Sequence, residues 1–481
     1  MATTARRRGT ALLALALASG VTLAVSIPAG AATTAPPAYY QGVTSANVLG
    51  VALHLPAALP ALPGIPKDLA VNLIGVNGNA VHNTLAGTDA NASTAVSNLA
   101  SGSLIDALPS NLGLKKTLTA TLSSDPAESV KSSSAQSINA SPLINVTVGG
   151  QLAKALKLDN TSSANLTDGK ILDLGTLLQI PAAGTTLLNT VTGALDSADV
   201  TGQVNEAIQS VQSALNGVLQ NDPTGQVATL ANQVESTVNS LQDTLNAFLS
   251  DLQNKVAGTA VVKVNLLDAT QSIAPSGGAA VSNAAVHLAD LDILDGVLTV
   301  KGFESGATAI ANGKPGGASA SFVGHKPIVA VGVSNVLTGT LDETGLTLEG
   351  VPALGDTVNA ALKTLQNTLN GLLNTLGVHL AFVPGHVDKV DPAGKFAQAT
   401  GPEYDIVVTN PVDKTALVEV GLGHGTTASV SAAQATRITK VNNPQAGPGT
   451  LPHTGANLPL IAGGGLALLL GAGYLRRRVM G

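Results

Sequence analysis

The sequence predicts an α+β protein with β-rich, antiparallel, sandwich-like regions and an inserted long antiparallel helical hairpin. Alternating runs of apolar and polar residues, bounded by Gly, Ser, Asn and Asp, recur along the chain and are typical of antiparallel strands. In the middle of the chain, apolar residues recur instead at every third or fourth position, which indicates helices. Hydrophobic residues make up 44% of the chain and charged residues 11%, a balance that excludes a highly charged disordered protein.

The strand pattern begins after a segment rich in Pro and Ala. Residues 32–66 contain Pro56, Pro60 and Pro63, and this composition predicts an extended lead-in. Residues 67–180 are predicted to form a first β-rich region. Its clearest strands are 70–76, 117–122 and 143–148.

The apolar period changes between residues 185 and 257. A first stripe of Val204, Ile208, Val211 and Leu215 is followed by a turn signal and a second, longer stripe, so we expect an antiparallel helical hairpin. Gln, Asn, Ser and Thr occupy the outer positions. The hairpin is therefore either a spacer or interaction surface, or an ordinary pair whose apolar stripes face the core. The core-facing arrangement is favoured.

Strands return over residues 258–401, together with one helix at 356–376. Residues 402–440 are predicted to form a small β unit, and residues 441–450 a flexible linker rich in Pro and Gly. The clearest strands of this half are 260–266, 285–293, 297–303, 328–333, 378–383, 404–408 and 416–420, with a hairpin around 342–345.

Charge and aromatic content argue against two kinds of partner. The net charge is −6, and six of the 24 basic residues lie in two Arg clusters near the ends. The remaining 18 basic and 30 acidic residues give the body a net charge of −12, which disfavours nucleic acid. With nine aromatic residues and no Trp, the chain is poor in the flat faces on which bases and sugar rings stack.

The sequence carries no linear motif for catalysis. The chain has no Cys, so thiolate sites and disulfides are excluded, and it has no nucleophile elbow, zinc-protease helix or P-loop. We therefore expect a protein that is not an enzyme and has no cofactor or metal. The closest pair of histidines, His379 and His386, is expected to lie in solvent-facing loops. The others are scattered: His54, His82, His287, His325, His424 and His453.

Two acidic clusters were weighed as ion sites. Asp290, Asp292 and Asp295 partly match a calcium loop, but an extra residue precedes Asp295, and the apolar residues between the carboxylates indicate the inward face of a strand. Paired glycosidase carboxylates need not be close in sequence, so a hydrolase remains an alternative. A polar turn is the favoured interpretation of the second cluster, His386, Asp388 and Asp391.

The N-terminal residues have the pattern of a secretory signal peptide over residues 1–31. An Arg triplet at residues 6–8 precedes an apolar stretch at 11–25, and Ala29 and Ala31 form the small-x-small site that signal peptidase accepts. Cleavage is expected after Ala31, with Ala32 as the alternative. An uncleaved membrane anchor is less favoured because the apolar run is shorter than a bilayer span of about 20 residues.

The most specific motif lies in residues 451–481. A pentapeptide is followed by an apolar stretch at 456–475 and an Arg cluster, which can hold the stretch across a membrane. This arrangement resembles the LPXTG cell-wall sorting signal of Gram-positive surface proteins. The pentapeptide consists of Leu451, Pro452, His453, Thr454 and Gly455, and the stop-transfer cluster of Arg476, Arg477 and Arg478.

The resemblance implies processing by a sortase. In that family the enzyme cleaves between Thr and Gly of the motif, here Thr454 and Gly455, and joins the Thr carboxyl group to peptidoglycan. The protein would then be secreted and anchored to the cell wall, with its C-terminal span in the membrane only transiently. A retained single-pass anchor that is never cleaved is the alternative.

A looser similarity lies in the body of the chain. The strand-turn-strand pattern at residues 287–300 is similar to one in actinobacterial surface proteins of uncertain activity. We therefore expect a surface protein with an adhesion, display or structural role and an unidentified surface ligand. The alternatives are a wall-attached hydrolase without a linear motif and a carrier of an apolar ligand.

Overall fold

The computed structural model describes sixteen segments of the chain. They all belong to a compact unit, Met1–Ala435, and a second unit comprises Thr436–Gly481. The described segments are 35–54, 68–85, 90–101, 117–122, 129–133, 136–140, 144–173, 193, 199–221, 225–254, 260–293, 295–324, 326–331, 336–342, 344–409 and 416–434.

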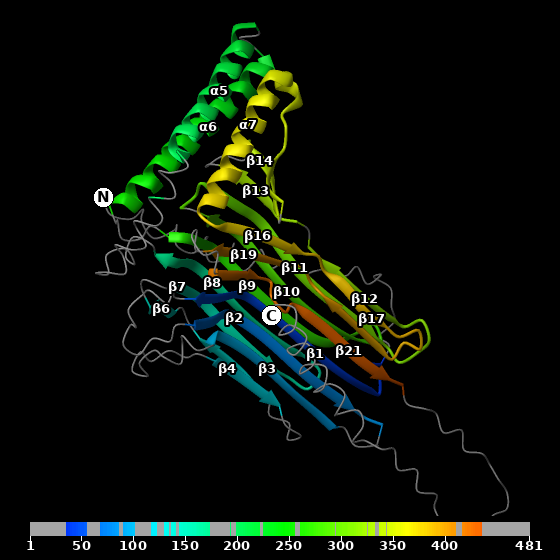
Figure 1. Cartoon of the computed structure of the whole chain (residues 1–481). Coiled ribbons are helices and arrows are strands. Elements are labelled where there is room, and N and C mark those ends of the chain that lie inside the picture. Colours follow the sequence, from blue (N-terminus) through cyan, green and yellow to red (C-terminus); the bar gives the residue numbers. More distant parts are fainter. Residues whose placement is uncertain are drawn as a thin grey trace, which may run out of the picture. The chain divides into compact units, whose positions relative to one another are not determined.

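The first of two antiparallel sheets has ten strands, in the order β16-β19-β20-β1-β2-β3-β4, with β17, β18 and β21 off this path (Figure 1). Its central strand β1 pairs with β2 along one edge. Along the other edge, its first half pairs with β21 and its second half with β20. The strands are β1 (Tyr39–His54), β2 (Asp68–Asn83), β3 (Ala90–Ser101), β4 (Thr117–Leu122), β16 (Val378–Val383), β17 (His386–Val390), β18 (Phe396–Thr400), β19 (Glu403–Thr409), β20 (Ala416–Leu422) and β21 (Thr427–Ala433).

The second sheet has eleven strands, in the order β15-β14-β13-β11-β10-β9-β8-β7-β5, with β12 beside β11 and β6 beside β7. Neighbouring strands of the sequence mostly pair with one another, as in a meander. The strands are β5 (Ser129–Ser133), β6 (Gln136–Ala140), β7 (Ile144–Ala155), β8 (Asn160–Asp173), β9 (Ala260–Ser276), β10 (Ala279–Ile293), β11 (Leu298–Ala311), β12 (Ala318–Val323), β13 (Ile328–Val331), β14 (Thr338–Asp342) and β15 (Gly345–Leu348).

The main hydrophobic core lies between the two sheets and the helices. It joins Val51 and Ile74 of the first sheet to Val264 and Leu291 of the second, and all four are at most 2% exposed. Leu365 of the last helix belongs to the same cluster. The fold is therefore β-rich α+β, as the alternating pattern predicts.

A second part of the interior is built from small and polar side chains. Tyr40, Ile273 and Val430 are its only large apolar members among the described residues, and Ala supplies the rest. A methyl group at Gly42 would lie 2.5 Å from Ile273 Cγ2, and one at Gly78 would lie 2.3 Å from Gln271 Oε1. The two sheets therefore approach closely here, and the Ala and Gly content of the sequence is what allows it.

Buried hydrogen bonds connect the sheets across this thin region. The hydroxyl of Thr44 donates to Gln271 Oε1 at 2.7 Å, and the Gln271 amide donates to Asn160 Oδ1 and Ser162 Oγ, both at 2.9 Å. The Asn160 amide then donates to the carbonyl of Asn79 at 3.1 Å. Because buried polar groups are costly unless paired, this network fixes the alignment of the sheets.

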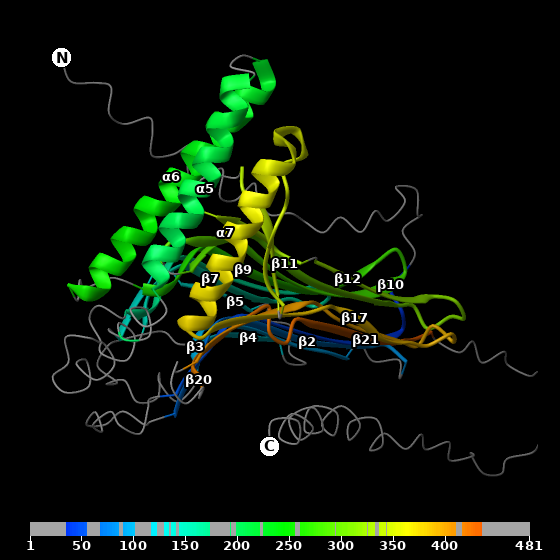
Figure 2. The ribbon, with the colours of Figure 1, turned by 45° about the horizontal axis from the view of Figure 1, so that its top comes forward.

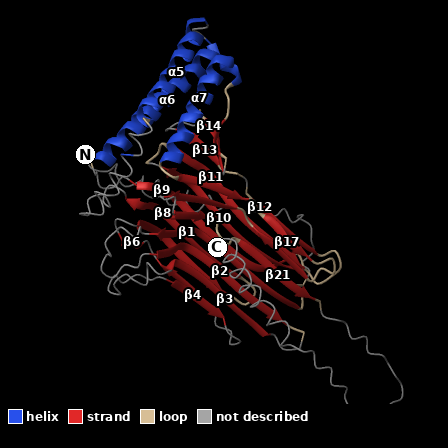
Figure 3. Ribbon diagram, in the orientation of Figure 1, coloured by secondary structure: helices blue, strands red, loops and turns tan. Residues whose placement is uncertain are grey.

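Three long helices lie together at one end of the strands (Figures 2 and 3). They are α5 (Val200–Asn221), α6 (Gly225–Gln253) and α7 (Gly355–Thr375), the last preceded by the short helix η2 (Pro352–Leu354). Helix α5 packs against α6 and α7, and α7 packs against β15 and β16. None of the helices in the described segments is both long and apolar enough to cross a membrane.

The helical apolar stripes face the core. Val204, Val211, Leu215 and Leu245 are each at most 2% exposed and belong to the main hydrophobic cluster. On the polar side, the Gln212 amide donates to Asn239 at 2.7 Å, and the Gln242 amide donates to Asn205 at 3.0 Å. These bonds join α5 to α6 through the outer polar positions.

Several predicted elements coincide with the observed ones, and others differ. Strands β4 and β16 have the expected bounds, and the predicted helix at 356–376 is α7. Part of the expected lead-in is a strand, because β1 occupies residues 39–54 at the centre of the first sheet. The strands expected to form a separate small unit, β19 to β21, are strands of that same sheet.

Candidate functional site

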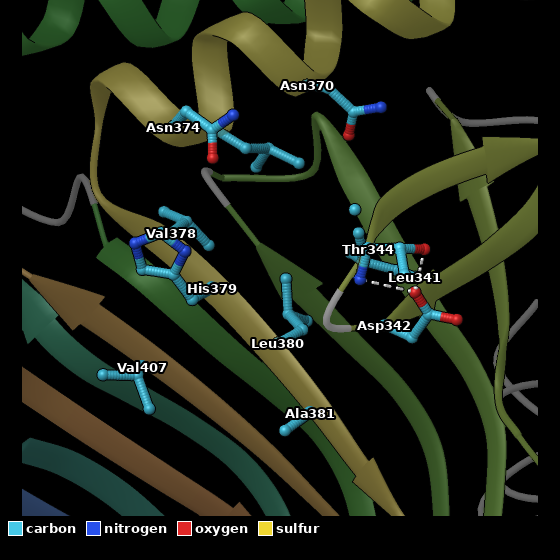
Figure 4. Close-up of a pocket in the computed structure, with 12 residues that line it drawn as sticks. Leu341, Asp342, Thr344, Asn370, Asn374, Val378, His379, Leu380, Ala381 and Val407 are labelled. Carbon is cyan, nitrogen blue, oxygen red and sulfur yellow. Dashed lines mark hydrogen bonds between the residues drawn. The ribbon is translucent and has the colours of Figure 1, made fainter.

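A pocket of about 420 Å³ lies where the edges of both sheets meet helix α7 (Figure 4). Its walls come from four places: strand β16, the end of β14 with the turn to β15, the last turns of α7, and Val407 of β19. Such a volume lies within the range of small-ligand sites. The sequence does not predict this pocket because its parts are far apart along the chain.

Helix α7 covers the edge of β15 with side-chain amides. Asn370 accepts a hydrogen bond from Leu346 N at 2.7 Å and donates to Leu346 O at 2.9 Å. Gln366 accepts from Leu348 N at 3.0 Å, and Asn359 accepts from Val351 N at 2.7 Å. The amides of α7 therefore replace a neighbouring strand, which removes the free edge that β15 would otherwise present.

Strand β16 lines the pocket with its edge instead of one face. Four consecutive residues, Val378 to Ala381, belong to the pocket wall. Successive side chains of a strand point to opposite faces, so a wall made of consecutive residues must include the strand's edge. The only strand paired with β16 in the described segments is β19.

The hydrogen-bonding pattern shows which backbone groups face the pocket. Thr409 N donates to Gly377 O at 2.8 Å, next to the paired residues Val378 and Val408. In an antiparallel pair, alternate residues bond to the same neighbour, so His379 and Ala381 bond toward β19. The N–H and C=O groups of Val378, Leu380 and Phe382 consequently point away from β19. Val378 and Leu380 are buried there, at 3% and 4% exposed.

Glycine at 377 sets the start of this strand. Its φ of +69° lies in the left-handed region, and a methyl group there would lie 2.3 Å from Thr409 O. Both constraints require Gly. Gly377 thereby ends α7 and directs the chain straight into β16.

Two polar side chains of the pocket have no hydrogen-bond partner within the part of the chain that the structure describes. Asn374 and His379 are both exposed and line the pocket. The Asn374 amide points from α7 toward β16 (Figure 4). These two groups are available to a ligand.

The carboxylate of Asp342 lies at the opposite end of the pocket. It forms an ion pair with Lys326 and accepts hydrogen bonds from Thr344 N at 2.8 Å and Thr344 Oγ1 at 2.6 Å. These contacts lower the pKa of Asp342 to about 2, and the hydrogen bond from Lys326 has the largest effect. The group is therefore ionised and already paired at neutral pH.

The pocket combines one acidic group with apolar side chains. Asp342 is its one carboxylate among the described lining residues. Leu341, Leu373 and Leu380 supply an apolar inner wall. The Asn374 amide adds a group that can form hydrogen bonds.

The described histidines pair mostly with acidic or amide groups on neighbouring strands. His287 on β10 lies between Asp268 of β9, at 3.3 Å, and Glu304 of β11, at 3.5 Å. His379 and His386 are exposed but lie on strands β16 and β17, so the expected loop placement is wrong. The remaining pairs are His54 with Asp68 and Glu419, His82 with Asn91, His386 with Asp388, and His424 with Glu403.

Two of the three residues weighed as a calcium loop are engaged with other side chains. Asp292 accepts from Asn265 and Thr299, and Asp295 pairs with Lys263. Within the described segments, no three acidic or histidine side chains converge as a metal site would require. Between the carboxylates, Leu291 and Ile293 are fully buried in the main cluster, as the sequence predicts.

The sequence-predicted processing sites lie outside the described segments. These are Ala29 and Ala31, the stop-transfer residues Arg476, Arg477 and Arg478, and the pentapeptide Leu451, Pro452, His453, Thr454 and Gly455. His325 also lies outside them. The predicted roles of these residues therefore remain predictions.

Comparisons with known proteins identify no relative. No protein-family model and no curated protein matches the chain. Three solved structures align weakly, each with a TM-score of 0.11, which assigns neither fold nor function. They are the outer membrane protease OmpT from Escherichia coli (6% identity, 83% of this chain and 95% of that chain), a BenF-like porin from Pseudomonas fluorescens Pf-5 (8%, 82% and 98%) and Pseudomonas aeruginosa OccK2 (OpdF) in complex with glucuronate (8%, 82% and 98%).

Proposed function

We propose that this chain is a secreted protein that a sortase attaches to peptidoglycan, and that it serves adhesion, display or envelope structure at the cell surface. The main support for this proposal is the order of three features: the Leu451–Gly455 pentapeptide, the apolar residues 456–475 and the Arg cluster at 476–478. An apolar stretch stopped by Arg can hold the pentapeptide just outside the membrane. The signal-peptide pattern at residues 1–31 supports the same destination.

We also propose that α5 and α6 form an antiparallel hairpin that stiffens one end of the displayed body. The support is the order of their contacts: Gln212 meets Asn239, whereas Asn205, earlier on α5, meets Gln242, later on α6. Partners that shift in opposite directions along two helices are expected of antiparallel packing. The buried apolar stripes of these helices leave no described apolar face for carrying a lipid, which weighs against the carrier alternative.

The test is the mass of the protein released from cell walls by muralytic digestion. We expect a chain that begins after Ala31, ends at Thr454 and carries peptidoglycan fragments. Thr454→Ala should abolish wall attachment because it alters the residue whose carbonyl the sortase would attack.

His453→Ala is the matched control, because position 453 is the variable position of the motif, and this variant should remain attached. Recovery of an intact C-terminus only from membranes would contradict sorting. Recovery inside the cell with residues 1–31 still present would contradict secretion as well.

A further inference from the structure

We infer that the helical end of the folded unit, formed by α5, α6 and α7, is the surface that the wall-attached protein presents to macromolecules outside the cell. The opposite end of the sandwich, where β21 ends, then faces the wall and is called the exit end. The orientation rests on the proposed attachment at Thr454 and adds a direction to it. Its support is the place where the chain leaves the sandwich, the length of the strands and the length of the tether.

The chain leaves the sandwich at the end of β21. Ala433, the last residue of β21, is paired with Tyr39, the first residue of β1. The β17–β18 turn lies at the same end, because Lys395 O accepts a hydrogen bond from the backbone of β21 at 2.9 Å. The side chain of Gln434, the last described residue, donates to Asn312 O in the β11–β12 turn. The exit end therefore contains two turns and the start of the connection to the sorting motif.

The helices lie at the other end of the same strands. The far end of β1 is connected to α7 by one row of paired residues across the first sheet. Leu53 of β1 pairs with Val418 of β20. Val418 pairs with Val408 of β19, which pairs with Val378, the first residue of β16 after α7. The 16 residues of β1 span about 50 Å, so this distance separates the exit end from the helical end (Figure 1).

The tether between the sandwich and the proposed attachment point is short in comparison. It comprises the twenty residues 435–454. A flexible chain of that length has a root-mean-square span of about 25 Å, about half the length of β1. Orientations in which the body points into the wall are excluded sterically. The exit end therefore stays near the wall, and the helical end lies farther out on average.

The composition of the helical end suits exposure to water. The apolar stripes of α5 and α6 are buried in the main cluster. The charged residues of these two helices are Glu206, Glu235, Asp243 and Asp251, and neither helix contains Lys or Arg. A macromolecule that approaches from outside therefore meets a hydrated, negatively charged surface, which repels anionic polymers.

The test uses single Cys substitutions, because the natural chain has no Cys. Gln220→Cys and Asn367→Cys place an exposed thiol on α5 and α7, and Lys314→Cys and Lys395→Cys place one in the two turns of the exit end. Intact cells are treated with a maleimide carried by an antibody-sized protein and, separately, with N-ethylmaleimide. Protein released from the walls by muralytic digestion receives the same two reagents.

On cells, we expect the large reagent to label the two helical positions several-fold faster than the two exit positions. After release, all four positions should be labelled at similar rates. The rate with N-ethylmaleimide corrects for differences in thiol reactivity between positions. Thr454→Ala combined with each Cys variant is the matched control, because unattached protein should lose the difference between the two ends.

Two results would overturn the orientation and leave wall attachment intact. One is equal labelling of both ends by the large reagent on cells, and the other is faster labelling of the exit end. Absence of all four variants from the wall fraction would instead contradict the proposed attachment, and the orientation would fall with it.

Discussion

At the scale of single residues, the acidic neighbours of His287 make the stability of the protein depend on pH. Asp268 accepts a hydrogen bond from His287, and this bond raises the pKa of His287. Burial acts in the opposite direction, and the negative charges of Asp268 and Glu304 raise the pKa further. A raised pKa means that the folded protein holds the proton more tightly than the unfolded chain. The resulting stabilisation is complete below the unfolded pKa of about 6.5 and is lost as pH rises through the folded pKa.

His287→Gln tests this dependence. At pH 5.5 the free energy of unfolding should fall by about 0.5–1 kcal/mol, the typical value of a partly exposed ion pair. At pH 8.5 the difference from the natural protein should be smaller, because the stabilisation by the charged imidazole is lost as pH rises. Urea unfolding at the two pH values measures both quantities, and an equal difference at both would contradict an electrostatic role.

At the scale of elements, α7 stabilises the second sheet by replacing a strand beside β15. Asn370 and Asn374 differ in this respect although they occupy the same face of the helix. Asn370 bonds to both backbone groups of Leu346, whereas Asn374 has no such partner among the described residues. The two positions should therefore contribute differently to the stability of the protein.

Asn370→Ala should lower the free energy of unfolding by about 2–3 kcal/mol, because it leaves two backbone groups of β15 without partners. Asn374→Ala should change it by less than about 0.5 kcal/mol, as expected for a surface substitution. Denaturant unfolding of the two variants measures the contrast. Equal losses would show that the amide row does not support β15.

Many of the helices and strands could be predicted from the sequence. The alternating period located β4 and β16, and the helical period located α7, because both patterns reflect burial on one side of an element. The pattern does not report which element lies beside which. The row of amides on α7 was visible in the sequence, but its role became apparent only with β15 beside it.

At the scale of the whole molecule, the close approach of the two sheets depends on small residues, Gly and Ala. Gly78→Ala should destabilise the protein by about 1–3 kcal/mol, because the new methyl group would displace Gln271 and Thr44 from their hydrogen bond. Gly217→Ala should do the opposite. Gly217 lies within α5, and no atom lies within 4 Å of the added methyl group. Ala is more favourable than Gly in a helix by about 1 kcal/mol. Thermal unfolding of both variants distinguishes a packing constraint from a general intolerance of added methyl groups.

The long-range pairing of the first sheet was not predictable from local patterns. Residues 39–54 lie in a Pro- and Ala-rich context that indicates an extended segment, yet they form the central strand. Their partners β20 and β21 lie at the far end of the described chain. The pocket escaped prediction for the same reason, because it combines Asp342, Asn374 and His379 from three elements.

The position of β1 has a consequence for biogenesis. A strand near the start of the unit cannot complete its pairing until β21, which ends at Ala433, has been made. Contacts between such distant segments form slowly. The first sheet can therefore be completed only after almost all of the unit has been synthesised, and this late completion would suit the export that we propose.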